Sequence, residues 1–299
     1  MANLKEIRLR IKSVKSTQQV TKAMKMVAAA KLKRAQNQMI QLRPYAGKLQ
    51  EIINNILSAI DAEDIPSDLV NVRPVHKVLV ILVSANRGLC GPFNTNILKH
   101  ASQFVAENYA QEAEAGKVSF LCIGRKGYEY IKKRNFPLIG ENWDAFTNLN
   151  FDYVNEIVER VFKGFRAGEF DRVHLVYNEF KNVMSQVRKA ESFLPLSADS
   201  LGGSKEEDGE LQQDYIFEPN REDILTELIP KALRVQVFRA ILESNAAEQG
   251  ARMVAMDTAT ENANELLKEL KINYNKARQA TITKEILEIA AGANALSAD

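Results

Sequence analysis

Apolar residues recur every seven positions along the first sixty residues of the chain. Two columns, three to four residues apart, describe this spacing. The first column contains Ile7, Val14, Thr21, Ala28, Ala35, Leu42, Leu49 and Ile56, and the second contains Ile11, Gln18, Lys25, Leu32, Met39, Ala46, Ile53 and Ile60. This heptad seam predicts a long helix over residues 1–60 that packs against a partner helix. Pro44 is expected to kink it.

The same spacing returns near the C-terminus and predicts a second helix over residues 221–299. No proline follows Pro230, and the pattern predicts a helix of about 60 residues, roughly 90 Å long. Neither helix can bury its apolar stripe alone, so we expect the two to form an antiparallel coiled coil. The C-terminal column contains Leu228, Val235, Leu242, Gln249, Met256, Ala263, Leu270 and Ala277.

Between the two helices the pattern changes to that of an α/β domain over residues 75–197. Apolar, β-rich runs occur at 77–85, 118–124 and 172–180, and helical patterns occur at roughly 95–114 and 152–167. This alternation predicts a small, largely parallel, Rossmann-like sheet. Residues 198–214 are polar, acidic and rich in glycine, as expected for a flexible loop.

Charge is distributed unevenly, although the net charge of the 299 residues is only +2. Residues 1–48 carry twelve Lys or Arg and one acid, whereas residues 221–270 carry six bases and nine acids. The basic helix could bind nucleic acid, contact an acidic protein partner, or present a solvated face. Its apolar residues favour a protein partner over nucleic acid. No run of apolar residues is long enough for a membrane span.

The polar interruption of the seam defines an expected register for the coiled coil. With Met24 opposite Arg252, the polar residues at 18, 21 and 25 lie near Asn245, Gln249 and Arg252. Residues 276–299 then project beyond the partner helix. Alternatively, Thr21 and Gln249 are polar residues buried within the coiled coil, where they fix the register of its two helices.

No residue pattern in the chain matches a catalytic or metal site. The turn at 86–92 (NRGLCGP) follows a β-rich run, but its glycines fit neither a dinucleotide nor a phosphate-loop motif, so a tight turn or partner contact is favoured. The GRKG turn at 124–127 is similarly weak evidence for a nucleotide site, and a connecting turn is favoured. The three histidines have no ligand spacing, and no histidine or acid accompanies Cys90 to complete a nucleophilic unit. Two cysteines favour a reducing compartment over a disulfide framework.

Four segments resemble the gamma subunits of F-type ATP synthases. They are IRLRIKSVKSTQQVTKAMKMVAAAKLKRAQ at 7–36, SANRGLCGPFNTNI at 84–97, NEFKNVMSQ at 178–186, and the long block at 243–296 that contains Ile-Thr-x-Glu-x-x-Glu-x-x-x-Gly-Ala at 282–293. Asn86 stands where many relatives have Asp, and Pro92 where many have Gly. The paired-cysteine insertion of the chloroplast form is missing around 198–214, so thiol control is not expected.

The resemblance implies a rotating shaft that couples proton flow to ATP synthesis or hydrolysis and regulates the ATPase. Its implied partners are the alpha and beta subunits of an alpha3beta3 head, the epsilon subunit and a membrane ring of c subunits. It implies no catalytic site, cofactor, metal or nucleic acid on this chain. The implied location is the cytoplasmic face of a bacterial membrane, reached only through the complex.

The resemblance also assigns contact roles to individual residues. The residues expected to face beta subunits are Met24, Lys25, Arg87, Cys90, Arg252, Gln279, Thr283, Glu285 and Glu288. The residues expected in the foot that meets the c ring and epsilon are Arg43, Tyr45, Tyr215 and Glu218. Ordinary packing within the chain is the alternative for the foot residues.

Overall fold

The computed structural model describes residues 4–57, 68–69, 72–143, 146, 149–196 and 221–296. The chain divides into two compact units. We call residues 1–28 with 252–299 the coil unit, and residues 29–251 the sheet unit. Two long helices, α1 (Leu4–Leu57) and α7 (Arg221–Leu296), each contribute to both units. The expected segment 198–214 lies outside the described residues.

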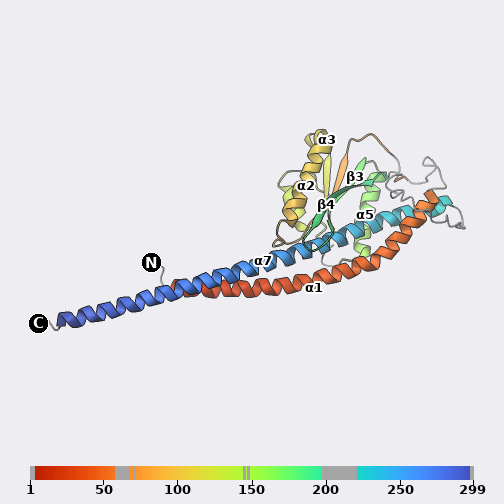
Figure 1. Ribbon diagram of the computed structural model, residues 1–299. Helices are drawn as coiled ribbons and strands as arrows, with labels where there is room; N and C mark the ends of the chain where they lie inside the picture. The colour runs from red at the N-terminus through yellow and green to blue at the C-terminus, as the bar shows by residue number, and fades with distance from the viewer. Residues whose placement is uncertain are drawn as a thin grey trace. The chain divides into compact units, whose positions relative to one another are not determined.

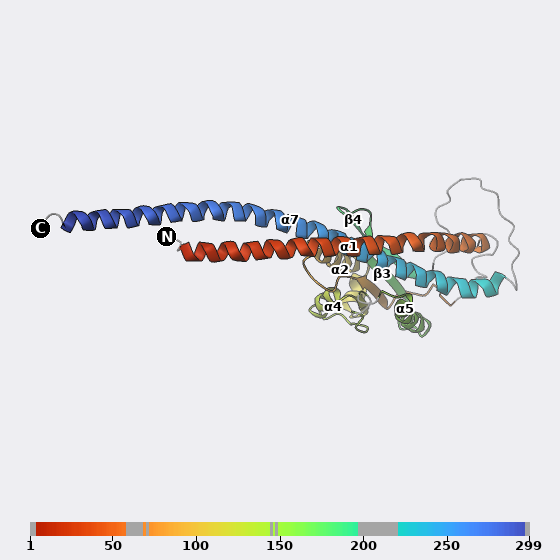
Figure 2. The same ribbon diagram turned by 90° about the horizontal axis from the view of Figure 1, so that it is seen from below.

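In the coil unit, the first part of α1 and the last part of α7 run antiparallel. The first turns of α1 lie beside α7, which continues past them toward the C-terminus (Figures 1 and 2). Side chains from residue 278 to residue 291 of α7 are all exposed, whereas Ala277 is half-buried. None of the described helices combines the length and apolar character needed to cross a membrane.

The sheet unit is built on a mixed sheet of four strands in the order β2-β1-β3-β4. Strands β1 (Val78–Val83), β2 (Val118–Ile123) and β3 (Arg172–Phe180) are parallel, and β4 (Gln186–Leu194) pairs antiparallel with β3. Every residue of β1 is buried, as expected for a strand covered on both faces.

Alternate residues of the strands enter two different cores. Val78, Val80 and Leu82 of β1 pack with helix α2 (Phe93–Asn108) on one face. Short helices α3 (Ala110–Glu114) and α4 (Arg125–Lys132) add to that face. On the other face, Leu79 and Ile81 pack with α5 (Phe151–Arg166) and with the sheet-unit parts of α1 and α7. Residues of both long helices are therefore part of this second core of the sheet unit.

The predicted fold class is confirmed, with differences in detail. Each α1 seam residue from Ile7 to Ile56 is buried or half-buried, as is each α7 column residue from Leu228 to Ala277. Helix α1 continues through Pro44, and α7 begins before Pro230. Two elements were not predicted, namely α4, which begins inside the GRKG segment, and the antiparallel strand β4. The sheet is therefore mixed.

A buried histidine on β3 gives a pH-dependent prediction for stability. Burial, followed by the nearby Arg172 charge, lowers the pKa of His174 to about 4 from its usual 6.5. Its Nε2 lies 2.6 Å from the Tyr109 hydroxyl. Between these pKa values the unfolded chain binds more protons, so the free energy of unfolding should fall by up to about 3 kcal/mol as pH drops from 6.5 to 4.

Urea unfolding at pH 7 and pH 4.5 measures this effect. His174→Asn should reduce the difference between the two pH values, whereas His76→Asn, at an exposed position, should leave it as in the wild type. Equal pH dependence in all three proteins would rule out His174 as the source.

Candidate functional site

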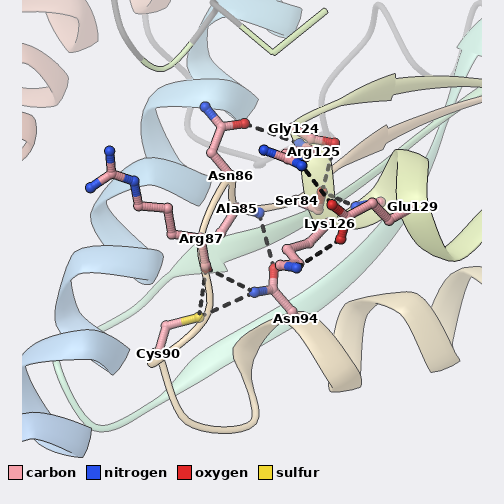
Figure 3. Close-up of polar contacts among 11 residues, drawn as sticks. Ser84, Ala85, Asn86, Arg87, Cys90, Asn94, Gly124, Arg125, Lys126 and Glu129 are labelled. Carbon is pink, nitrogen blue, oxygen red and sulfur yellow. Dashed lines mark hydrogen bonds and ion pairs between the residues drawn. The ribbon is translucent and has the colours of Figure 1, made fainter. Parts of the chain in front are cut away.

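The turn between β1 and α2 is fastened by one side chain from the first turn of α2. Asn94 accepts a hydrogen bond from the Ala85 amide through Oδ1 (3.0 Å). Its Nδ2 donates to the Arg87 carbonyl and to the Cys90 sulfur, both at 3.3 Å (Figure 3). Leu89 adopts φ 62°, a strained value for a residue with a branched side chain. Arg87 and Leu89 remain exposed on this fixed loop.

A second set of contacts joins this turn to the start of α4. The Ser84 hydroxyl accepts from the Gly127 amide (2.7 Å) and donates to the Gly124 carbonyl (3.3 Å). Asn86 accepts from the Arg125 amide (3.0 Å) and donates to the Trp143 carbonyl (2.8 Å). An aspartate at position 86 could make only the first of these two bonds. The asparagine thus suits the local geometry of this chain.

The turn also packs against α7 inside the sheet unit. Cys90 and Phe93 form a cluster with Ala247 and Ala251 of α7, and Phe180 at the end of β3 packs on the same cluster. This position is the carboxyl edge of parallel strands, where open α/β sheets usually bind their ligands. Here the small side chains of α7 occupy part of that edge. Cys90, only 1% exposed, is a packing residue in this chain.

Among the described residues, polar side-chain pairs join the two helices of the coil unit. The hydrogen bonds are Arg8 to Tyr274 (2.9 Å), Gln18 to Asn264 (2.5 Å), Thr260 to Thr21 (2.8 Å) and Lys25 to Asp257 (2.5 Å). The sequence positions decrease on α7 as they increase on α1, which is the antiparallel arrangement. The pair Lys25–Asp257 is half-exposed, so it contributes at most about 1 kcal/mol.

The register predicted from the sequence is wrong by about six residues. Gln18, Thr21 and Lys25 face Asn264, Thr260 and Asp257, not the segment from Asn245 to Arg252. The earlier residues Asn245 and Gln249 belong to the sheet unit. Four partner residues, Asp257, Thr260, Asn264 and Tyr274, were therefore missed. Their helical spacing of three, four and ten residues is the sequence signal that could have found them.

The residues expected to face beta subunits fall into three groups. Arg87 and Cys90 share the fastened turn, while Met24, Lys25 and Arg252 lie in the coil unit. The remaining four are exposed on the part of α7 that extends past α1. These four are Gln279, Thr283, Glu285 and Glu288.

The expected foot is described only in part. Arg43 and Tyr45 are exposed on α1, with Tyr45 at 45%. Tyr215 and Glu218 lie outside the described residues. In the ranges that the structure describes, no group of three or more His, Cys, Asp or Glu could hold a metal ion. Contacts of all these residues with other subunits remain predictions.

Comparisons with known proteins cover nearly the whole chain. Residues 3–296 match the family described as ATP synthase. The chain is 53% identical to the ATP synthase gamma chain of Chlorobium limicola, with 99% of each covered. It is 50% identical to that of Cytophaga hutchinsonii, with 99% of this chain and 100% of the relative covered.

Solved structures with a similar fold come from mitochondrial ATP synthases. One is a chain of the Euglena gracilis OSCP/F1/c-ring structure, with a TM-score of 0.67 and 20% identity, covering 99% of this chain and 95% of that chain. Another is a chain of the Tetrahymena thermophila central stalk/c-ring structure, with a TM-score of 0.57 and 25% identity, covering 80% of this chain and 99% of that chain.

Proposed function

Because this chain belongs to the ATP synthase gamma-chain family, we propose that it couples proton flow through a membrane c ring to nucleotide chemistry in an alpha3beta3 head. Its role is that of the central rotating shaft of the rotary complex. The single observation that carries the proposal is the match to gamma chains over 99% of the sequence. The long exposed end of α7 gives this shaft a tip that extends past α1.

The mechanism follows from the asymmetry of the shaft. An asymmetric body inside a ring of three beta subunits makes different contacts with each of them, so its angle biases each subunit between conformations by differential contact energy. A proton crossing 100 mV contributes about 2.3 kcal/mol, so several proton steps must be summed for each ATP. Rotation then changes which catalytic site releases its product.

The predicted contact residues on the turn, on the exposed end of α7 and in the foot have different chemistry in this mechanism. The exposed Arg87 presents a cation from a fixed loop. Glu285 and Glu288 lie on the exposed helical tip, where Lys284 pairs with Glu288 at 3.6 Å. We assign Arg43 and Tyr45 to the foot, which meets the c ring and epsilon. The complex brings the chain to the cytoplasmic face of a bacterial membrane as a peripheral subunit.

Co-purification from cells expressing the whole operon tests the proposed function. We expect one copy of this chain for every three beta subunits, together with epsilon and the c ring. Membrane vesicles that contain the complex should pump protons when ATP is added. A complex that assembles and pumps without this chain would contradict the proposal.

We also expect the isolated chain to bind no nucleotide in the micromolar range and to have no ATPase activity. The supporting observation is that Ala247 and Ala251 of α7 pack at the carboxyl edge of the sheet, where a nucleotide would otherwise bind. Calorimetric titration of the purified chain with ATP and magnesium measures this directly. Saturable micromolar binding would overturn the assignment of catalysis to other subunits.

A further inference from the structure

A cavity of about 730 Å³ lies inside the sheet unit, between α1, the end of β4 and α7. Its walls come from residues within 39–49 of α1, within 191–196, and within 232–243 of α7. Leu42 and Leu233 are among its apolar side chains. Pockets that hold small organic molecules usually measure about 300–1,000 Å³ and are mostly apolar. The size and lining of this cavity therefore suit the apolar body of a small ligand.

One carboxylate in the wall of this cavity has an oxygen atom without a partner. The side chain of Glu243 is only 14% exposed, and among the described residues its buried Oε2 atom has no hydrogen-bond partner. Arg239, one turn earlier on α7, lies 3.7 Å from Oε1, which is too long for a hydrogen bond. Burial raises the pKa of Glu243, and the charge of Arg239 opposes this effect. The free oxygen is therefore a site for a hydrogen-bond donor.

The charges around Glu243 leave one negative charge without compensation. Glu179 and Glu191 raise its pKa, whereas Arg239 and Lys189 lower it. Lys189 is already engaged, because its Nζ atom lies 3.0 Å from Glu179 and 3.7 Å from Glu191. This group contains three acids and two bases, so one more positive charge would balance it. A cation is therefore the complementary ligand group beside Glu243.

A basic residue at the same cavity does not reverse this preference. Arg43 of α1 also lines the cavity, but it is an exposed residue. Solvent and salt screen a charge in that position, whereas Glu243 acts from a largely buried position at lower dielectric. A cationic group beside Glu243 therefore gains more than an anionic group beside Arg43.

We propose that this cavity binds a small amphipathic organic cation, which donates a hydrogen bond to Glu243 Oε2 and packs its apolar body between Leu42 of α1 and Leu233 of α7. This site goes beyond the proposed function and does not depend on other subunits. The carboxylate is already largely removed from water in the free chain, so binding avoids much of that cost. Because the ligand contacts both helices, it should also stabilise the sheet unit against unfolding.

Calorimetric titration of the purified full-length chain with n-octylamine tests this site. Near neutral pH the probe is a cation, because the pKa of a lysine-like amine is about 10.4, and it is used below the concentration at which it forms micelles. We expect saturable binding of one molecule per chain. Octanol and octanoate have the same chain length without the positive charge, and they should bind at least about tenfold more weakly, the loss expected for one charge-assisted hydrogen bond.

Three variants locate the binding site. Glu243→Gln keeps the shape of the side chain without its charge, and it should weaken octylamine binding by about tenfold or more. Glu227→Gln is the matched control, because Glu227 is exposed on the same helix, and it should bind as the wild type does. Ala46→Trp fills the cavity from α1 and should remove the binding. Urea unfolding checks that each variant is folded and whether octylamine raises the wild-type midpoint.

Several results would overturn the site. They are the lack of saturable octylamine binding to the wild type, equal binding of octanol or octanoate, and unchanged binding by Glu243→Gln. If that variant does not fold, unchanged binding by Ala46→Trp has the same force. The titration uses this chain alone, so its failure is distinct from a failure of the co-purification that tests the proposed function.

Discussion

Replacing Gly124 by alanine is expected to cost about 4 kcal/mol or more of folding free energy, a large share of the roughly 5–15 kcal/mol that keeps a native protein folded. A Cβ at this position would lie 2.0 Å from the Ser84 carbonyl oxygen and 2.7 Å from its carbon. Gly124 also has φ 110°, which side-chain-bearing residues rarely adopt. Neither the backbone of β1 nor that of α4 can move aside, because both are tied into the sheet unit.

Alanine substitutions at two other glycines separate the cost of a steric clash from the cost of an unfavourable φ angle. Gly116 has φ 68° but no atom within 4 Å of an added Cβ, so Gly116→Ala should lose about 1 kcal/mol. Gly88 has an open position without a positive φ, and Gly88→Ala should be nearly neutral. Urea unfolding of the three variants measures the series. Equal losses at Gly124 and Gly116 would show that the approach to Ser84 is not decisive.

Deleting residues 276–299 is expected to reduce coupled ATP synthesis to less than a tenth, whereas deleting residues 292–299 should leave at least half of it. Since α7 ends at Leu296, the longer deletion shortens the helix by about 32 Å and the shorter one by about 8 Å. In the observed register, Leu4 at the start of α1 lies near Arg278, so the residues beyond it have no α1 partner. The longer deletion also removes Gln279, Thr283, Glu285 and Glu288 together.

The truncations are scored for both the assembled complex and ATP synthesis in membrane vesicles. A third variant that lacks residues 282–299 removes only helix that extends past α1, and it should assemble like the shortest deletion. An isolated helix of this length is only marginally stable in water, so the surrounding subunits are expected to order it. Equal damage from all three deletions would contradict a graded role for the tip.

The long helices were predictable because their seams are periodic, and the coil register was not. A heptad repeat indicates which face of a helix is buried, but it is compatible with several registers in which one helix is shifted along the other. Only specific pairs such as Gln18–Asn264 and Thr21–Thr260 distinguish among them. Polar residues with short side chains occur at several positions of α7, so the sequence offered more than one partner for each.

Two elements of the sheet unit, β4 and α4, could not be predicted from the sequence, for different reasons. β4 (QVRKAESFL) is an edge strand with mostly half-exposed side chains, so its charged residues obscured the apolar run. Helix α4 is short and contains Gly127, which packs against the Ser84 hydroxyl and resembled a turn signal.

The scarcity of buried apolar side chains in the coil unit affects how it responds to temperature. Among its described residues, the buried apolar ones are Ala28, Met256, Ala263 and Leu270. Apolar exposure dominates the heat-capacity change of unfolding, so separating these two helices should involve only a small heat-capacity change. Their cohesion should therefore vary little between cold and warm conditions. Salt should weaken it instead, because the half-exposed pair Lys25–Asp257 is screened by ions.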